Sequence, residues 1–591
     1  MMDNEIKNPF EYLTPDSIEA KSAIDIFVDV FKDYYNVLNQ GNTFITGPRG
    51  SGKSMMFRIM KPDCQKLKNS KSLNELKFFG VYIPVKDTSL NVTDLKILED
   101  KHGANLLNEH FMVLYLSIVI FNALKEQDYS SFPNTLEEIK NFYNHVFIKR
   151  LINSGWQKEE SDQIELQNTN SVFEQMKIIC ETMQSKFVHN YVRDLTNKLK
   201  PIPYLGPLCL YFDFLFPILK EIRKFSFLPK APIYLMVDDA DELSLTQTKI
   251  LNSWVSFRST ADVCYKISST HLRYKTYYTT SNSRIDSPHD YSELDLTEVY
   301  TSDKKDRYYS NVKEMVEKRL KAALIKDISA EKYFPANEKQ EAEIKKLSEK
   351  YKADHGYDYA YRYSRPDYMK GLPNKYAYSY SGFTQLVHLS SGIIRNFLDL
   401  AAKMFTRTIN EGKEFLAIPD NIQDSEIKDY SDKFLHNEFD KLTNDENLTE
   451  EKLNNHKKLY NLIQSLGKMF RIILMSDAKE RRIFSFQFED EPSQTLKEVL
   501  KLGVIYNYFQ ISAKGDKAGT GRAKLYILNR MLAPYFRLDP NNFSGYKYLT
   551  SDSLELAMTD FRKFLFKFTK GDFSSDFDGL QMKLFDSEDI L

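Results

Sequence analysis

Cysteine is scarce in this sequence of 591 residues, and its few copies are scattered. The four cysteines are Cys64, Cys180, Cys209 and Cys264, and none belongs to a C-x-x-C pair. We therefore expect neither a structural zinc site nor a disulfide framework, and a reducing cytoplasm is the natural compartment. The first residues contain no basic segment followed by an apolar core, so we expect no secretory signal.

Long hydrophobic runs and an excess of charge of one sign are also missing. The longest apolar run covers residues 111–121. A membrane helix needs about 20 residues, so this run predicts a buried helix and no membrane partner. The 81 basic residues nearly balance the 82 acidic ones, which excludes a uniformly basic chain but leaves a local basic patch open. The length predicts about four globular domains.

Because glycine is scarce, three glycines between residues 47 and 52 stand out. Gly47, Gly52, Lys53 and Ser54 fit the phosphate-loop pattern G-x-x-x-x-G-K-[ST]. In this pattern the backbone N–H groups surround phosphates, the lysine reaches the β- and γ-phosphates, and the hydroxyl binds Mg²⁺. Residues 43–46 read as a buried strand and residues 54–60 as a helix, which is the required context. The expected nucleotide contacts are Gly47, Pro48, Arg49, Gly50, Ser51, Gly52, Lys53, Ser54 and Met55.

An acidic partner for this loop is expected at residues 231–242. Residues 233–237 are continuously apolar, as in a central parallel strand that is buried on both faces. Asp238 follows and, with Ser54, is the expected Mg²⁺ ligand. Asp239 lies at the position where many P-loop ATPases carry a glutamate that orients the attacking water. Asp241 and Glu242 lie nearby, so the identity of the catalytic base stays open.

The remaining strands of a parallel sheet are predicted at residues 78–85, 263–267 and 291–299. A helix over residues 245–255 precedes the strand at 263–267. Ser268, Ser269 and Thr270 follow that strand, and a hydroxyl there would sense the γ-phosphate or form an ordinary turn. Arg258 has two interpretations, a surface arginine or an arginine finger that reaches the nucleotide of a neighbouring subunit.

Helical periodicity dominates the segments outside this core. We divide the chain into a first part of the core (1–104), a helical insertion (105–230) and a second part of the core (231–304). A helical lid (305–415), a winged-helix domain (416–550) and a C-terminal helix with an acidic tail (551–591) follow. The lid includes a tyrosine-rich stretch, residues 351–380, which would either pack on the core or stack on nucleic-acid bases.

Gly392 and Arg395 open an amphipathic helix within the lid. A G-x-x-R element at this place would hold Arg395 over the γ-phosphate and couple lid closure to the nucleotide. The alternative is a solvated arginine at the start of a helix.

The C-terminal third has the order of a winged helix. Helices are predicted at 457–475 and 492–502, strands at 483–488, 504–511 and 523–528, and a glycine-rich hairpin tip lies between the last two. From residue 497 to 530 there are seven basic residues against two acidic ones. Lys514, Lys517, Arg522 and Lys524 are the expected contacts to the phosphates of double-stranded DNA. A wing that contacts only protein is the alternative.

Taken in this order, these motifs resemble the AAA+ ATPases of the origin-recognition and replication-initiator family. The segments NPFEYLTPDSIEA (8–20), GPRGSGKSMMFR (47–58), VDDADELS (237–244) and YSGFTQLVHLSSGIIRNFLDLA (380–401) are similar to bacterial origin-recognition-like ATPases. The resemblance implies an α/β P-loop core with a parallel sheet, a large helical insertion, a helical lid and a C-terminal winged helix. It further implies ATP and Mg²⁺ as ligands, a homo-oligomer, and Phe10, Tyr12 and Leu13 beside the adenine. Bacterial ATPases of this kind resemble components of anti-phage defence or mobile-element systems.

Two functions follow from these observations. The first is an ATP-dependent switch in which Lys53, Asp238, Asp239 and Arg395 carry slow hydrolysis and the winged helix engages DNA. The second is a signalling scaffold that holds a nucleotide and regulates an effector protein without binding DNA.

Overall fold

A computed structural model gives the fold of the chain. It describes residues 7–11, 14–86, 88–89, 103–157, 168–192, 204–257, 260–296, 305–325, 328–373, 377–390, 392–414, 416–443, 448–515, 522–541 and 545–569. The chain divides into two compact units. The sheet unit comprises residues 14–47 and 53–295, and the C-terminal unit comprises residues 1–13, 48–52 and 296–591.

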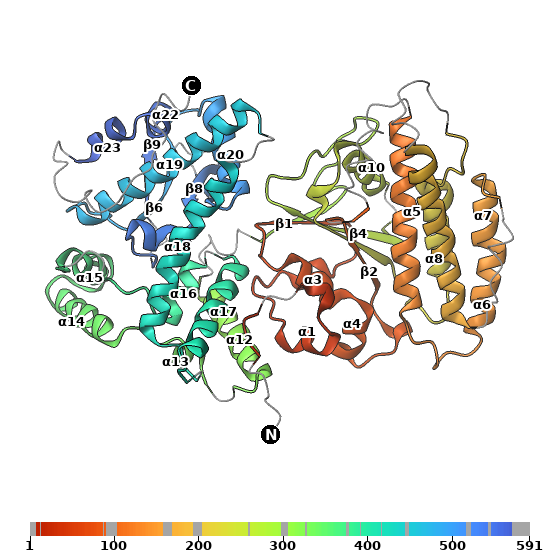
Figure 1. Ribbon diagram of the computed structural model, residues 1–591, viewed down its shortest axis with the longest axis horizontal. Helices are drawn as coiled ribbons and strands as arrows, with labels where there is room; N and C mark the ends of the chain where they lie inside the picture. Colours follow the sequence, from red (N-terminus) through yellow and green to blue (C-terminus); the bar gives the residue numbers. More distant parts are fainter. Residues whose placement is uncertain are drawn as a thin grey trace. The chain divides into compact units, whose positions relative to one another are not determined.

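The sheet unit is built on a five-stranded sheet within the described residues (Figure 1). Its strands are β1 (Thr43–Gly47), β2 (Phe79–Pro84), β3 (Ile233–Asp238), β4 (Val263–Thr270) and β5 (Ser292–Asp295). Their order is β2-β3-β4-β1-β5, and every pair is parallel. All residues of β1, β3 and β4 are buried, which explains why these strands read as continuous rather than alternating apolar runs.

Helices cover this sheet. They are α1 (Ala20–Ile26), α2 (Tyr34–Val37), α3 (Lys53–Met60), α4 (Pro62–Asn69), α5 (Ala104–Lys125), α6 (Thr135–Phe142), α7 (Ile148–Asn153), α8 (Thr169–Lys186), α9 (Phe216–Ile222) and α10 (Leu245–Ser256). Short π-helical segments join some of them at Tyr143–Phe147, Phe187–Val192 and Tyr211–Leu215.

The predicted helical insertion lies between β2 and β3. Its helix α5 is the one helix in the described part of the chain that is long and apolar enough to cross a membrane. Most of its apolar side chains are buried, and it packs along α8 and against β2 and α10. It is therefore packed as a core helix, as the length of its apolar run predicts.

The C-terminal unit begins with helices that include the predicted lid. They are α12 (Lys305–Ala322), α13 (Ala330–Tyr333), α14 (Glu338–His355), α15 (Tyr357–Gly371), α16 (Phe383–Leu389) and α17 (Ile394–Asn410). Helices α14 and α15 pack on each other as a hairpin (Figure 1).

The tyrosine-rich stretch falls largely on α15 and the segment after it. Tyr378 and Tyr380 are buried, and Tyr351 donates a hydrogen bond to Asp367. Tyr357 and Tyr361 are exposed. Part of the stretch therefore packs on its own unit, while the exposed rings leave the stacking interpretation as a prediction.

The rest of the C-terminal unit consists of α18 (Asp420–Thr443), α19 (Glu450–Met475), α20 (Gln494–Ile505), α21 (Ala533–Phe536), α22 (Ser551–Thr559) and α23 (Phe561–Thr569). A four-stranded sheet in the described residues has the order β7-β8-β6-β9. Its strands are β6 (Ile483–Phe488), β7 (Phe509–Gly515), β8 (Arg522–Leu528) and β9 (Gly545–Leu549). The order of helices, β6 and the β7–β8 hairpin agrees with the predicted pattern, and a winged helix stays a prediction.

Two predicted strands have different bounds in the structure. The strand predicted at 504–511 begins only at Phe509, because α20 continues through Ile505 and ends in a turn where Asn507 has a φ of +62°. The apolar residues Val504 and Ile505 belong to that helix. The strand predicted at 291–299 is only β5, and residues 297–299 lie outside the described residues.

Candidate functional site

Three neighbouring strands end together at the edge of the sheet where the predicted site lies. Gly47 at the end of β1 lies in register with Thr270 at the end of β4, and Val237 of β3 lies in register with Ile267 of β4. In parallel α/β sheets, ligands bind at the carboxyl ends of the strands, where the strand order changes direction. The end of β1, the end of β4 and Asp238 therefore lie at one edge of the sheet.

Lys53 begins α3 and is buried beside the loop. Its Nζ donates a hydrogen bond of 2.8 Å to the carbonyl oxygen of Gly47. Gly50 and Gly52 have φ values of +87° and +97°, in the left-handed region that favours glycine. The buried Ser51 Oγ has no hydrogen-bond partner among the described residues. A buried ammonium group and an unsatisfied hydroxyl beside such a loop fit an oxygen-rich anion such as a phosphate chain.

Asp238 is held by two hydroxyl groups. Tyr82 Oη of β2 donates a hydrogen bond of 2.8 Å to its Oδ2, and Ser268 Oγ of β4 donates to its Oδ1. Asp238 is buried at 2% exposure, so these bonds supply the partners that a buried carboxylate requires. Ser268 Oγ also accepts a hydrogen bond of 3.0 Å from the backbone N–H of Asp239. One side chain therefore fixes both members of the Asp-Asp pair.

Asp239 and Asp241 differ in their surroundings. Asp241 is buried, accepts a hydrogen bond of 2.9 Å from the N–H of Thr270, and lies 3.5 Å from Nε of Arg273. Asp239 is half-buried and has a φ of +54°, a conformation that aspartate tolerates better than most residues. The carboxylate of Asp241 thus fixes the end of β4, whereas Asp239 occupies a tight turn directly after Asp238.

Two other hydroxyl groups at the end of β4 form no hydrogen bond with any described residue. Ser269 Oγ and Thr270 Oγ1 are buried and have no hydrogen-bond partner among the described residues. Because a buried hydroxyl without a partner is costly, these two groups are better explained as contacts to a ligand or to ordered water than as part of a turn.

Arg395 contacts the phosphate loop within the C-terminal unit, to which loop residues 48–52 belong. Its backbone N–H donates a hydrogen bond of 3.0 Å to the carbonyl oxygen of Gly50. Arg395 lies in the first turn of α17, where N–H groups have no partner within the helix, and the residue before this helix, Ile393, has no side chain that can cap it. The carbonyl of Gly50 therefore takes the place of a helix cap.

The contact between Gly50 and α17 is close. A Cβ atom on Gly50 would lie 2.4 Å from the Cβ of Arg395. The Arg395 side chain is half-buried, and its charge lies near Asp399 and Tyr430. Burial raises the pKa of the Asp399 carboxyl, and the positive charge of Arg395 opposes that rise.

The other predicted residues lie in the C-terminal unit, in the first turn of α3, or outside the described residues. Phe10 is buried against Tyr333 and Phe334, with ring centroids 5.8 and 5.6 Å apart. Tyr12, Leu13, Arg258 and Lys517 lie outside the described residues. On the β7–β8 hairpin, Lys514 lies in register with Ala523, Arg522 with Gly515, and Lys524 is exposed. Ser54 and Met55 lie in the first turn of α3, next to Lys53.

Tyr82 is the residue of this site that the sequence analysis missed. It lies on β2, 156 positions before Asp238. Its only sequence signal is a polar-tipped aromatic side chain near the end of an apolar strand, and that signal acquires meaning only once β2 and β3 are known to be neighbours.

The comparisons agree with this geometry. A family model described as ORC-CDC6-like matches residues 8–358 and 342–547, which is most of the chain. No curated protein matches it. The five-stranded parallel sheet with its helices fits the α/β P-loop fold of AAA+ ATPases, a class whose members bind and hydrolyse nucleotides. The chain belongs to the ORC-CDC6-like family of AAA+ ATPases.

Proposed function

We propose that this protein is an ATP-dependent molecular switch. It binds ATP with Mg²⁺, hydrolyses it slowly, assembles into a homo-oligomer and engages double-stranded DNA through its C-terminal winged helix. Family membership supports nucleotide binding and hydrolysis in general, and the geometry of the site supports the roles assigned to individual residues below.

Residues of the loop and of the sheet edge would hold the nucleotide and its metal. The backbone of residues 47–52 would surround the phosphates, and Lys53 Nζ would exchange its bond to Gly47 for phosphate oxygens. Ser54 and Asp238 supply the oxygen ligands that Mg²⁺ prefers. The bound metal would neutralise negative charge on the phosphate oxygens as the terminal phosphate leaves.

Hydrolysis is assigned to Asp239. Asp241 is already engaged by the N–H of Thr270 and by Arg273, so its carboxylate is the poorer candidate for a base. Asp239 would orient the attacking water. Because aspartate is one methylene shorter than glutamate, a long reach to that water is consistent with slow turnover.

The contact between Arg395 and Gly50 is the observation that carries the switch. The first turn of α17 is bonded to the carbonyl of Gly50, at the loop that would receive the phosphates. A change in the loop on nucleotide binding or release would therefore be transmitted directly to the lid helix. The guanidinium of Arg395 would add a positive charge over the γ-phosphate.

DNA binding and the biological setting complete the proposal. The basic β7–β8 hairpin, with Lys514, Lys517, Arg522 and Lys524, would lie on the phosphate backbone. The resemblance to bacterial origin-recognition-like ATPases supports a cytoplasmic role in anti-phage defence or in a mobile-element system, beside a separate effector protein.

Nucleotide binding is tested with Lys53→Ala. We expect this variant to lose affinity for labelled ATP while its circular dichroism and melting temperature stay near those of the wild type. Lys71→Ala, an exposed lysine after α4, is the matched control. Unchanged ATP affinity in Lys53→Ala would refute the assigned site.

The switch is tested by measuring ATP turnover and particle mass together, with and without double-stranded DNA. Turnover that rises with DNA and mass that rises with ATP would support an assembling, DNA-responsive ATPase. ATP turnover near zero, together with a particle mass that does not change when DNA is added, would favour the alternative, a scaffold that regulates an effector protein.

A further inference from the structure

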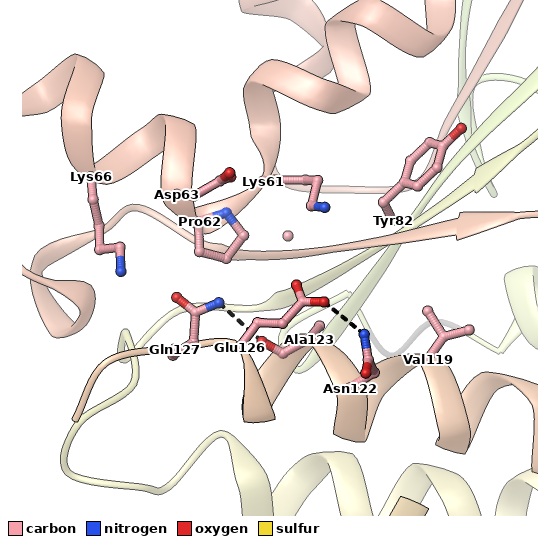
Figure 2. Close-up of a pocket in the computed structure, with 11 residues that line it drawn as sticks. Lys61, Pro62, Asp63, Lys66, Tyr82, Val119, Asn122, Ala123, Glu126 and Gln127 are labelled. Carbon is pink, nitrogen blue, oxygen red and sulfur yellow. Dashed lines mark hydrogen bonds between the residues drawn. The ribbon is translucent and has the colours of Figure 1, made fainter. Parts of the chain in front are cut away.

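Tyr82 lies on the edge strand β2 and belongs to none of the motifs on which the proposed site is built. It is half-buried beside a cavity between α4 and the end of α5. Figure 2 shows its hydroxyl pointing away from the other residues that line this cavity. The role of this hydroxyl therefore has to be sought in the sheet and not in the cavity.

The register of the sheet brings Tyr82 to Asp238. Tyr82 lies in register with Met236 of β3, and Asp238 is two positions further along that strand. Because side chains alternate along a strand, all three point to the same face of the sheet. One strand across and two residues along is a separation of about 8 Å. The long phenol spans it and donates a hydrogen bond of 2.8 Å to Asp238 Oδ2.

Helix α3, whose first turn contains Ser54, packs on the same part of the sheet. Phe57 of this helix is fully buried, and its ring centroid lies 6.5 Å from that of Tyr82. The helix and β2 approach closely, since a Cβ atom on Gly80 would lie 2.5 Å from the carbonyl oxygen of Met60. Phe57 follows Ser54 by three positions, so the two are neighbours on one face of the helix.

Tyr82 therefore contacts both elements that supply the expected Mg²⁺ ligands. Its ring packs on α3, which carries Ser54, and its hydroxyl holds Asp238 at the end of β3. Mg²⁺ requires near-octahedral geometry with oxygen ligands at about 2.1 Å. The separation of the two ligand-bearing elements has to be fixed closely to meet this requirement.

We propose that Tyr82 is a positioning residue for the Mg²⁺ of the bound nucleotide. It sets the distance between the Ser54 hydroxyl and the Asp238 carboxylate, and it acts through Asp238 without binding the metal itself. Ser268 holds only the other carboxylate oxygen, Oδ1. Without the Tyr82 hydroxyl, the carboxylate would lose the bond that fixes Oδ2. The inference rests on the proposed function, because it takes Ser54 and Asp238 as the ligands of Mg²⁺.

The test is Tyr82→Phe, which keeps the ring against Phe57 and removes the hydroxyl. The affinity of the full chain for a fluorescent, non-hydrolysable ATP analogue is measured without divalent metal and then at rising Mg²⁺ concentrations. Without Mg²⁺, the variant should bind the analogue as the wild type does. The Mg²⁺ concentration that gives half of the gain in affinity should rise by about tenfold or more, as is typical when a partner of a metal ligand is lost.

Tyr234→Phe is the matched control. Tyr234 is a buried tyrosine of β3, and its hydroxyl donates a hydrogen bond of 3.0 Å to the carbonyl oxygen of Leu38. The control therefore loses a tyrosine hydroxyl and a hydrogen bond of similar length in the same sheet. Its Mg²⁺ requirement should equal that of the wild type. Melting temperatures without nucleotide show whether both variants are folded.

Three results would overturn the role of Tyr82 and leave the proposed function standing. The first is an Mg²⁺ requirement of Tyr82→Phe equal to that of the wild type. The second is an equal rise in Tyr82→Phe and Tyr234→Phe, which would trace the effect to a general loss of stability. The third is an affinity of Tyr82→Phe that falls by the same factor with and without Mg²⁺, which would mean that Tyr82 supports the nucleotide site as a whole.

A failure of the proposed function gives a different result. If Mg²⁺ does not change the affinity of the wild type for the analogue, the metal ligands assigned to Ser54 and Asp238 are wrong, and the role of Tyr82 falls with them.

Discussion

At the scale of single residues, one hydroxyl group controls the geometry of the Asp-Asp pair. Ser268 Oγ donates to Asp238 and accepts from the N–H of Asp239. Its removal would leave a buried carboxylate with one partner fewer. We expect Ser268→Ala to lower the free energy of unfolding by about 1–3 kcal/mol and to reduce ATP hydrolysis more than ATP binding.

Ser269→Ala is the matched control for stability without nucleotide, because its hydroxyl has no hydrogen-bond partner among the described residues. It should not lower the free energy of unfolding, since no hydrogen bond within the protein is lost. Denaturant unfolding without nucleotide would compare the stability of both variants, and ATP binding and steady-state hydrolysis would be measured for Ser268→Ala. Equal stability losses in the two serine variants would contradict the role of Ser268 in holding Asp238 and Asp239.

The sequence indicates candidate site residues where the chemistry is contiguous. Lys53, Ser54 and Asp238 are recognisable because a loop or strand end places them within a few positions of a diagnostic pattern. Tyr82 was missed because its hydrogen bond to Asp238 depends on packing between segments that are distant in the chain. No local pattern distinguishes it from the many other tyrosines.

At the scale of elements, the phosphate loop and α17 share one close contact. In Gly50→Ala, the new Cβ would lie 2.4 Å from Arg395 Cβ, in a backbone conformation that alanine rarely adopts. We expect the start of α17 to separate from the loop. Hydrogen exchange at residues 393–396 should become at least about tenfold faster, since a lost hydrogen bond is worth about 1 kcal/mol and the clash adds to it.

Gly52→Ala separates the contact from the backbone strain. Gly52 has a similar φ of +97°, but a Cβ there would meet no atom within 4 Å. This variant should therefore leave exchange at the start of α17 near the wild-type rate. Faster exchange in both variants would mean that the loop as a whole, not the contact at Gly50, controls the lid helix.

Helix α19 carries a second element-scale prediction. Burial of Lys468, whose Nζ lies 5.6 Å from the ring centroid of Phe561, lowers the pKa of its ammonium group from 10.5 to about 7. Between these two pKa values the unfolded chain binds a proton that the folded chain does not. The stability of the C-terminal unit should therefore rise with pH across this window and be lowest below pH 7.

Lys468→Met removes this dependence. Methionine avoids the cost of the buried ammonium group, so the variant should be more stable than the wild type at pH 7. The difference between their free energies of unfolding should shrink by about 2 kcal/mol between pH 7 and pH 9, since each pH unit is worth about 1.4 kcal/mol per proton. Thermal melting at several pH values measures it, with Lys458→Met, a half-buried lysine of the same helix, as the control. A constant difference between wild type and Lys468→Met would contradict the lowered pKa.

Helix and strand types follow from periodicity, but their ends depend on tertiary contacts. The apolar residues Val504 and Ile505 fit either a strand or a helix, and α20 includes both because Asn507 adopts a left-handed turn after it. Likewise, β4 continues through Thr270, three residues past the apolar run, because Gly47 of β1 pairs with Thr270. Neither end is encoded locally.

At the scale of the whole molecule, a nearly neutral chain has to concentrate its positive charge locally if it is to bind DNA. The β7–β8 hairpin offers Lys514, Lys517, Arg522 and Lys524, whereas the net charge of the chain is −1. If each of these residues neutralises one phosphate, the logarithm of the DNA affinity should fall with the logarithm of the salt concentration. Changing all four to alanine should reduce that slope by about 3 to 4.

The control removes the same charge from a different surface. Helix α14 carries the exposed lysines Lys339, Lys345, Lys346 and Lys350, and changing these four to alanine lowers the net charge equally. Fluorescence anisotropy with a labelled duplex across a salt series would compare both variants with the wild type. A reduced slope in the hairpin variant alone supports a DNA-binding wing. Equal reductions in both variants would indicate that only the net charge matters. An unchanged slope in the hairpin variant would favour a wing that contacts only protein.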